Sequence, residues 1–161
     1  MSAISNEEKQ NNYRIQFQRL KKAMDNAFFL EAIFIAYAIM EDRTESILAY
    51  EGNQIVPKNE REFISFKRKC NKKVKLAERK GSIIGRYFYD DLMAKTMEWV
   101  NGRNSVIHAL LKKNTTKEEL KSFAEQGEAL CKKLRNRTNN YKRMLQRRGM
   151  LAGNDSEEVT T

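Results

Sequence analysis

His108 is the only histidine of this 161-residue chain, and the residues before it suggest chemistry. It ends the run Arg103-Asn104-Ser105-Val106-Ile107-His108. An imidazole titrates near neutral pH, so it can take a proton from a ribose 2′-hydroxyl or return one to a leaving 5′-oxygen. An arginine binds phosphate with two parallel hydrogen bonds and stabilises the charge that develops on it. Together these two side chains can support RNA cleavage without a metal ion.

On an ideal helix, the side chains of Arg103 and His108 point in different directions. Five residues at about 100° each place Arg103 about 140° around the helix from His108. Asn104 is four residues from His108 and lies on nearly the same face. A long arginine side chain, an irregular first turn at Gly102 or a second subunit has to close the gap.

A purely structural interpretation of the same region stays open. His108 can pack at the edge of the apolar face that residues 106–110 provide. Trp99 and the aromatic residues 87–89 can line a substrate groove or a dimer seam, but core packing is the default role of such side chains.

The elements that position these residues are predicted to be helices. The chain has one proline, Pro57, and seven glycines, too few turn residues for an all-β fold. Its length is sufficient for one domain with its own core. We expect an all-α, single-domain bundle of five or six helices over residues 1–148, followed by a disordered acidic tail over 149–161.

Apolar periodicity and capping residues place the individual helices. Asn26 is predicted to cap the second helix, and Gly81 and Gly85 to bracket a short turn. Asn101-Gly102 is predicted to interrupt or kink a helix that begins near Arg86. Thr115 and Thr116 precede Glu118 and Glu119 at capping-box spacing. The predicted helical ranges are 7–24, 27–50, 60–80, 86–101, 103–113 and 117–148.

Several classes of protein are disfavoured by the same composition. The most apolar stretch, residues 28–40, contains Glu31 and is shorter than the roughly 20 residues of a membrane span. No signal-peptide core precedes it, so we expect a cytoplasmic protein. Cys70, Cys131 and the single histidine lack zinc-site spacing, so we expect no metal, no cofactor and buried or half-buried thiols.

The positive charge of the chain is concentrated in two segments. The net charge is +10, but residues 61–80 carry +7 and residues 132–148 carry +8, the latter with no acidic residue. Helices with basic faces can follow a phosphate backbone and bind it in a salt-dependent way. Solubility and an anionic membrane surface are alternatives, and no aromatic residues interleave these cations. The candidate nucleic-acid-binding residues are Lys67, Arg68, Lys72, Lys73, Lys75, Lys132, Lys133, Arg135 and Arg137.

The run from Arg103 to His108 resembles the signature of the HEPN superfamily of small helical bundles. That signature is an arginine, four to six residues and a histidine, commonly with Asn, Asp or His directly after the arginine. Arg103, Asn104 and His108 fit the four-residue form. The helical layout over residues 7–148 is also similar to that of the family.

The resemblance implies a metal-independent endoribonuclease that leaves a 2′,3′-cyclic phosphate, often a toxin or an antiviral defence effector. It implies a homodimer in which two copies of the motif face each other, with Arg103 and His108 catalytic and Asn104 fixing the arginine or the phosphate. An acidic residue on an earlier helix is common in the family, and Glu41 or Asp42 is the candidate, unless it is a surface charge paired to neighbouring cations.

The sequence thus predicts a ribonuclease that acts on single-stranded RNA, with a protein inhibitor as a possible further partner. The alternative is a non-catalytic helical module that binds RNA or a partner protein through its basic helix faces, as some members of the superfamily do.

Overall fold

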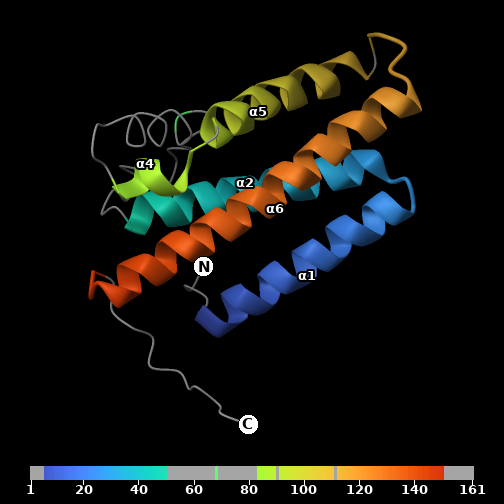
Figure 1. The fold of residues 1–161 in the computed structure, drawn as a ribbon. Coiled ribbons are helices and arrows are strands. Elements are labelled where there is room, and N and C mark those ends of the chain that lie inside the picture. The colour runs from blue at the N-terminus through green and yellow to red at the C-terminus, as the bar shows by residue number, and fades with distance from the viewer. Residues whose placement is uncertain (1–5, 51–67, 69–82, 90, 111, 151–161) are drawn as a thin grey trace, which may run out of the picture.

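The computed structural model describes residues 6–50, 68, 83–89, 91–110 and 112–150. Within these ranges the chain forms helices and no strand (Figure 1), which confirms the predicted all-α bundle. None of the helices there is long and apolar enough to cross a bilayer. The five helices are α1 (Asn6–Asp25), α2 (Phe29–Tyr50), α4 (Ile83–Tyr87), α5 (Leu92–Ala109) and α6 (Lys117–Arg147).

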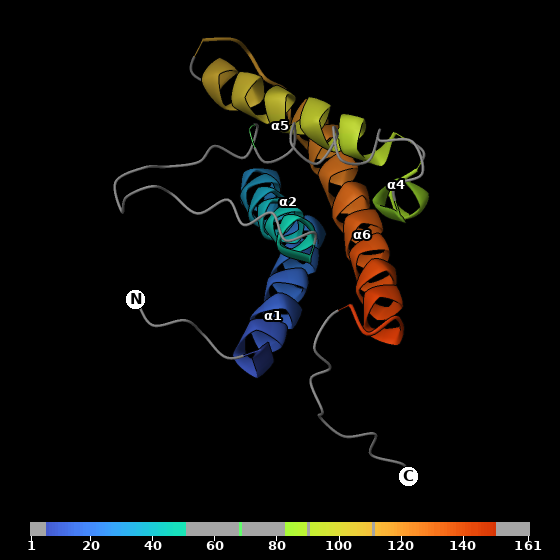
Figure 2. The ribbon, with the colours of Figure 1, turned by 90° about the vertical axis from the view of Figure 1, so that its left-hand side faces the viewer.

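The core of the bundle is built around α2 and α6, which share the largest helix–helix contact. Ala32, Ile33 and Ala36 of α2 are fully buried, because the small alanines let neighbouring helices approach closely. The thiol of Cys131 on α6 donates a hydrogen bond of 3.3 Å to the carbonyl oxygen of Ala36. Figure 2 shows α5 on one side of α2 and α1 on the other. The expectation of a buried thiol is confirmed for Cys131.

Local sequence signals set both ends of α6. The hydroxyl of Thr116 accepts a hydrogen bond of 3.1 Å from the backbone N–H of Glu119, whose carboxylate accepts one of 2.8 Å from the Thr116 N–H. This reciprocal pair is the predicted capping box. Gly149 follows the last turn with a φ of +66°, a conformation in which glycine has no steric penalty.

The predicted break at Asn101-Gly102 is wrong, because α5 runs without interruption from Leu92 to Ala109. A Cβ on Gly102 would lie 3.2 Å from the Phe123 ring, so the glycine permits close packing of α5 on α6 rather than a turn. The chain breaks earlier instead, at Asp91, which has a φ of +53°. The turn predicted between Gly81 and Gly85 is wrong over residues 83–85, which belong to α4.

Asn26 does not cap α2 as predicted. Its backbone N–H and its side-chain amide both donate to the carbonyl oxygen of Lys22, at 3.1 and 2.7 Å. Asn26 therefore satisfies a carbonyl at the end of α1, and α2 begins only at Phe29. The predicted helix over 60–80 and residues 151–161 of the predicted tail lie outside the described residues, apart from Arg68.

The seam between α5 and α6 fixes the position of the candidate site. Trp99 of α5 is buried, as predicted, and stacks on Phe123 of α6 with 4.9 Å between ring centroids. Its indole N–H donates a hydrogen bond of 3.0 Å to the Phe123 carbonyl oxygen. Gly127 leaves room for the indole, because a Cβ there would lie 2.5 Å from Trp99 Cζ2.

Candidate functional site

Arg103 continues the buried stripe of α5 that includes Thr96 and Trp99. Its half-buried guanidinium lies over the rings of two α2 aromatics, 4.3 Å from the Tyr37 centroid and 5.2 Å from that of Phe34. Its Nη1 donates a hydrogen bond of 2.9 Å to Asn104 Oδ1, and its buried Nε has no hydrogen-bond partner among the described residues. Asn104 thus orients the guanidinium, consistent with one of its expected roles.

His108 is exposed to solvent, so its imidazole is not part of the buried core. The alternative of packing at the edge of the apolar face stays a prediction. Because about 140° of helix separates them, Arg103 is directed toward α2 while His108 is directed away from the core. Among the described residues, no hydrogen bond joins the two side chains.

Of the two acidic candidates on α2, Asp42 belongs to a polar cluster between α1 and α2. Its carboxylate accepts hydrogen bonds from the hydroxyl of Tyr13 and from Arg43, and it forms an ion pair of 3.3 Å with Lys9. Arg43 also donates to the Tyr13 hydroxyl and lies over the Tyr13 ring. The interpretation of Asp42 as a charge paired to neighbouring cations is confirmed.

The electrostatics of this cluster favour a structural role. Burial opposes the charge on Asp42, but the hydrogen bonds from Tyr13 and Arg43 and the charges of Lys9 and Arg43 outweigh it and lower its pKa. Burial raises the pKa of the Tyr13 hydroxyl. Glu41 is half-buried and lies four residues after Tyr37, on the side of α2 that faces Arg103.

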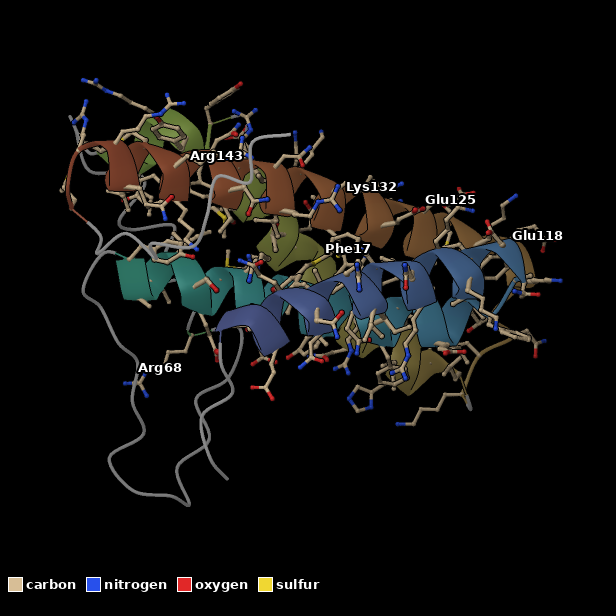
Figure 3. All side chains as sticks on the ribbon, turned by 90° about the horizontal axis from the view of Figure 1, so that it is seen from below. Phe17, Arg68, Glu118, Glu125, Lys132 and Arg143 are labelled. Atoms are coloured by element: carbon tan, nitrogen blue, oxygen red, sulfur yellow. The ribbon has the colours of Figure 1, made fainter. Side chains whose placement is uncertain are left out.

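Charge is segregated along α6. Figure 3 shows Glu118 and Glu125 toward one end of the helix, Lys132 near its middle and Arg143 toward the other end. Residues 132–148 hold eight lysines and arginines and no acid. Cations near a helix C-terminus interact favourably with the helix dipole, so part of this pattern has a local cause.

The candidate nucleic-acid-binding residues on α6 have different surroundings. Lys132 is paired with Glu128 at 2.7 Å, whereas Lys133 is exposed. Arg135 and Arg137 are half-buried. Arg68 is exposed, and Lys67, Lys72, Lys73 and Lys75 lie outside the described residues. Five cations of residues 132–148 form neither an ion pair with a described acid nor a stack on a described aromatic ring: Lys133, Lys142, Arg143, Arg147 and Arg148.

The sequence did not reveal that α6 arginines stack on aromatic rings of other helices. The Arg135 guanidinium lies 4.5 Å from the centroid of Phe17 on α1, and that of Arg137 lies 3.5 Å from the centroid of Tyr89. Tyr89 is 51% exposed, so the expectation of core packing is wrong for this aromatic. The partners are distant in sequence, and only the tertiary fold brings them together.

The described residues include no cluster of three or more His, Cys, Asp or Glu able to hold a metal ion. Their chemistry is that of guanidinium, ammonium, imidazole and aromatic groups, which favours anionic and planar ligands. Comparison of the chain with family models, with curated proteins and with solved structures gives no match.

Proposed function

We propose that this protein binds RNA through the α6 basic surface, by which we mean the exposed and half-exposed cations of residues 132–148. The observation that supports this most directly is the group of five cations of residues 132–148 that neither pair with a described acid nor stack on a described aromatic ring. Unpaired cations at a protein surface attract phosphates, and each contact releases counterions from the nucleic acid. The acidic residues at the other end of α6 restrict this attraction to one half of the helix.

The test is the salt dependence of binding. We expect the full chain to bind a fluorescent single-stranded RNA, and log K to fall linearly with log salt concentration. If all five cations contact phosphates, the slope is about −3.5, because each contact on a single strand contributes about −0.7.

A matched pair of triple variants locates the surface. Replacing Lys133, Arg143 and Arg147 with glutamine is expected to weaken binding and to make the slope shallower by about 2. The control replaces Lys112, Lys113 and Lys117, three exposed cations near the acidic end of α6, with glutamine. It removes the same charge and is expected to leave the slope nearly unchanged. Equal effects of the two variants would mean that net charge, rather than this surface, drives binding.

A second candidate function is a metal-independent endoribonuclease of the HEPN type. It is favoured by the exposure of His108 together with the hydrogen bond that orients Arg103. His108 would take the proton of a ribose 2′-hydroxyl, whose oxygen attacks the phosphorus. The 5′-oxygen then leaves with a proton, and a 2′,3′-cyclic phosphate remains. Because the two groups face different ways in one chain, we propose a site that needs two copies.

Complementation distinguishes a shared site from a site within one chain. His108→Ala and Arg103→Ala are each expected to abolish cleavage of single-stranded RNA in the presence of EDTA. If each site takes its arginine from one copy and its histidine from the other, mixed dimers of the two variants contain one intact site and recover activity. Cleavage by His108→Ala alone, or a requirement for magnesium, would contradict the mechanism.

A further inference from the structure

Tyr89 and Arg137 form a stacked pair on the flank of the α6 basic surface. The Arg137 guanidinium lies 3.5 Å from the centre of the Tyr89 ring. This is the shortest cation–aromatic distance among the described residues. Tyr89 nevertheless remains 51% exposed. The guanidinium covers one face of the ring, and about half of the residue's surface is still exposed to solvent.

The exposure of Tyr89 is unusual among its neighbours. Tyr87 and Phe88, directly before it, pack against the fully buried Tyr141 of α6 with centroids 5.5 and 5.9 Å away. These two contacts hold the chain between α4 and α5 against α6. Tyr89 is therefore an exposed aromatic on a rigid support, with no described aromatic ring on its open face.

Two cations and one amide lie on the same side of the helix as Arg137. Lys133 precedes Arg137 by one helical turn, about 6 Å along the axis, and is exposed without an ion pair to a described acid. Asn140 lies three residues after Arg137 and is exposed. Arg148 lies further along the same side of the helix. A planar platform is thus flanked by groups that bind phosphates and by an amide.

This combination suits an unpaired base. Proteins hold single strands by stacking bases on aromatic rings and on arginine planes while cations follow the backbone. In a duplex, both faces of each base are already stacked on neighbours, so the ring would have no open base to receive. An arginine already stacked on the opposite face keeps the ring fixed and adds positive charge below it.

We propose that Tyr89 and Arg137 are a stacking seat for one unpaired base of a single-stranded RNA bound to the α6 basic surface. The proposal rests on the proposed RNA binding and assigns its preference for single strands. Lys133 binds a phosphate adjacent to the stacked nucleotide. The seat makes binding depend on the shape of the ligand as well as on its charge.

The experiment compares Tyr89→Leu with Tyr89→Phe in the full chain. The ligands are a single-stranded RNA containing 2-aminopurine, whose fluorescence falls when it stacks, and a duplex of the same sequence. Tyr89→Leu is expected to weaken single-strand binding by about 5- to 150-fold and to abolish the quenching. Its salt slope and its duplex affinity should stay those of the wild type, because no charge is removed. Tyr89→Phe retains the ring and should behave as the wild type.

A second variant tests the arginine separately. Arg137→Lys keeps the charge but loses the planar group, so we expect reduced quenching with an unchanged salt slope. The exposure of Tyr89 allows these variants to fold, which circular dichroism checks. If Tyr89→Leu leaves single-strand affinity and quenching unchanged, the proposal of a stacking seat is wrong. The proposal that the α6 basic surface binds RNA is not affected by that result. Absence of RNA binding by the wild type would overturn both.

Discussion

Replacement of Gly127 by alanine should destabilise this protein, although the same change normally stabilises a helix. In the interior of α6, alanine is favoured over glycine by about 1 kcal/mol. The added Cβ, however, would lie 2.5 Å from Trp99 Cζ2 and 2.9 Å from Trp99 Cε2. Because carbon atoms pack best at about 3.5–4.0 Å, the indole has to move by about 1 Å.

The indole cannot move that far without losing contacts. It stacks on Phe123, an interaction of about 0.5–1.5 kcal/mol, and its N–H donates to the Phe123 carbonyl, a bond of about 1 kcal/mol. Overpacking of a core typically costs about 1–3 kcal/mol. Loss of both contacts costs about 1.5–2.5 kcal/mol, so after the helix preference of about 1 kcal/mol is subtracted we expect Gly127→Ala to lower the free energy of unfolding by about 0.5–1.5 kcal/mol.

Urea unfolding measures this effect directly, because Trp99 is the only tryptophan and its fluorescence reports on the seam itself. Gln126→Ala, at an exposed neighbouring position, controls for helix preference and should change the free energy of unfolding little. In a Trp99→Leu background, where unfolding in urea is followed by circular dichroism because no tryptophan remains, the clash disappears, so Gly127→Ala should become neutral or stabilising. The effect of Gly127→Ala on the free energy of unfolding should then differ by about 2 kcal/mol between the two backgrounds. Stabilisation by Gly127→Ala in the wild-type background would refute this packing of α5 on α6.

Three further predictions concern stability. Thr116→Ala should lower the free energy of unfolding by about 1 kcal/mol in urea, because it removes the hydroxyl of the capping box; an unchanged midpoint would contradict this role. Tyr141→Phe should leave thermal stability unchanged or raise it, because the buried Tyr141 hydroxyl has no hydrogen-bond partner in the part of the chain that the structure describes; a lower Tm would contradict this. Asp42→Asn should destabilise the protein at pH 7. A carboxyl whose pKa is lowered by folding stabilises the folded protein at pH values above its unfolded pKa, about 3.9. This stabilisation is lost as the pH falls through the folded pKa. The difference in unfolding free energy between wild type and Asp42→Asn should therefore shrink at pH 3, and an equal difference at both pH values would refute the role of the charge.

The parts of the fold that could be predicted from sequence are those that depend on local signals. The limits of α6 follow from the Thr116–Glu119 capping box and from Gly149, all of which act within one helical turn. The apolar run over residues 28–40 accounts for the buried residues of α2, such as Ala32, Ile33 and Ala36, although Phe34 in the same run is 49% exposed. In both cases, residues close in sequence determine the outcome.

The predictions that failed concern residues whose role depends on a distant partner. Asn101-Gly102 has the composition of a turn, but Gly102 faces the ring of Phe123, so tertiary packing rather than turn formation explains it. Asn26 serves the helix that precedes it rather than the one that follows. Sequence patterns identify such residues as unusual but do not show which neighbour uses them.

The candidate site shows the same distinction between features that follow from local sequence and features that depend on the tertiary fold. The separation of Arg103 and His108 on α5 follows from helix geometry alone, and the structure agrees with it, since one side chain lies on α2 and the other is exposed. The aromatic partners of the arginines were not predictable, because Tyr37, Phe17 and Tyr89 all come from other elements. The charge of α6 is thus evident from sequence, whereas its stacking surfaces emerge only from the fold.

The position of α5 links the two proposed activities. The Trp99 seam holds α5 against α6, and the same helix directs Arg103 toward α2 and His108 into solvent. If the α6 basic surface binds RNA and two copies share the catalytic site, as proposed above, RNA binding needs one chain and cleavage needs two. Dilution should then abolish cleavage at concentrations where binding persists, and cleavage per chain that does not change on dilution would contradict the shared site.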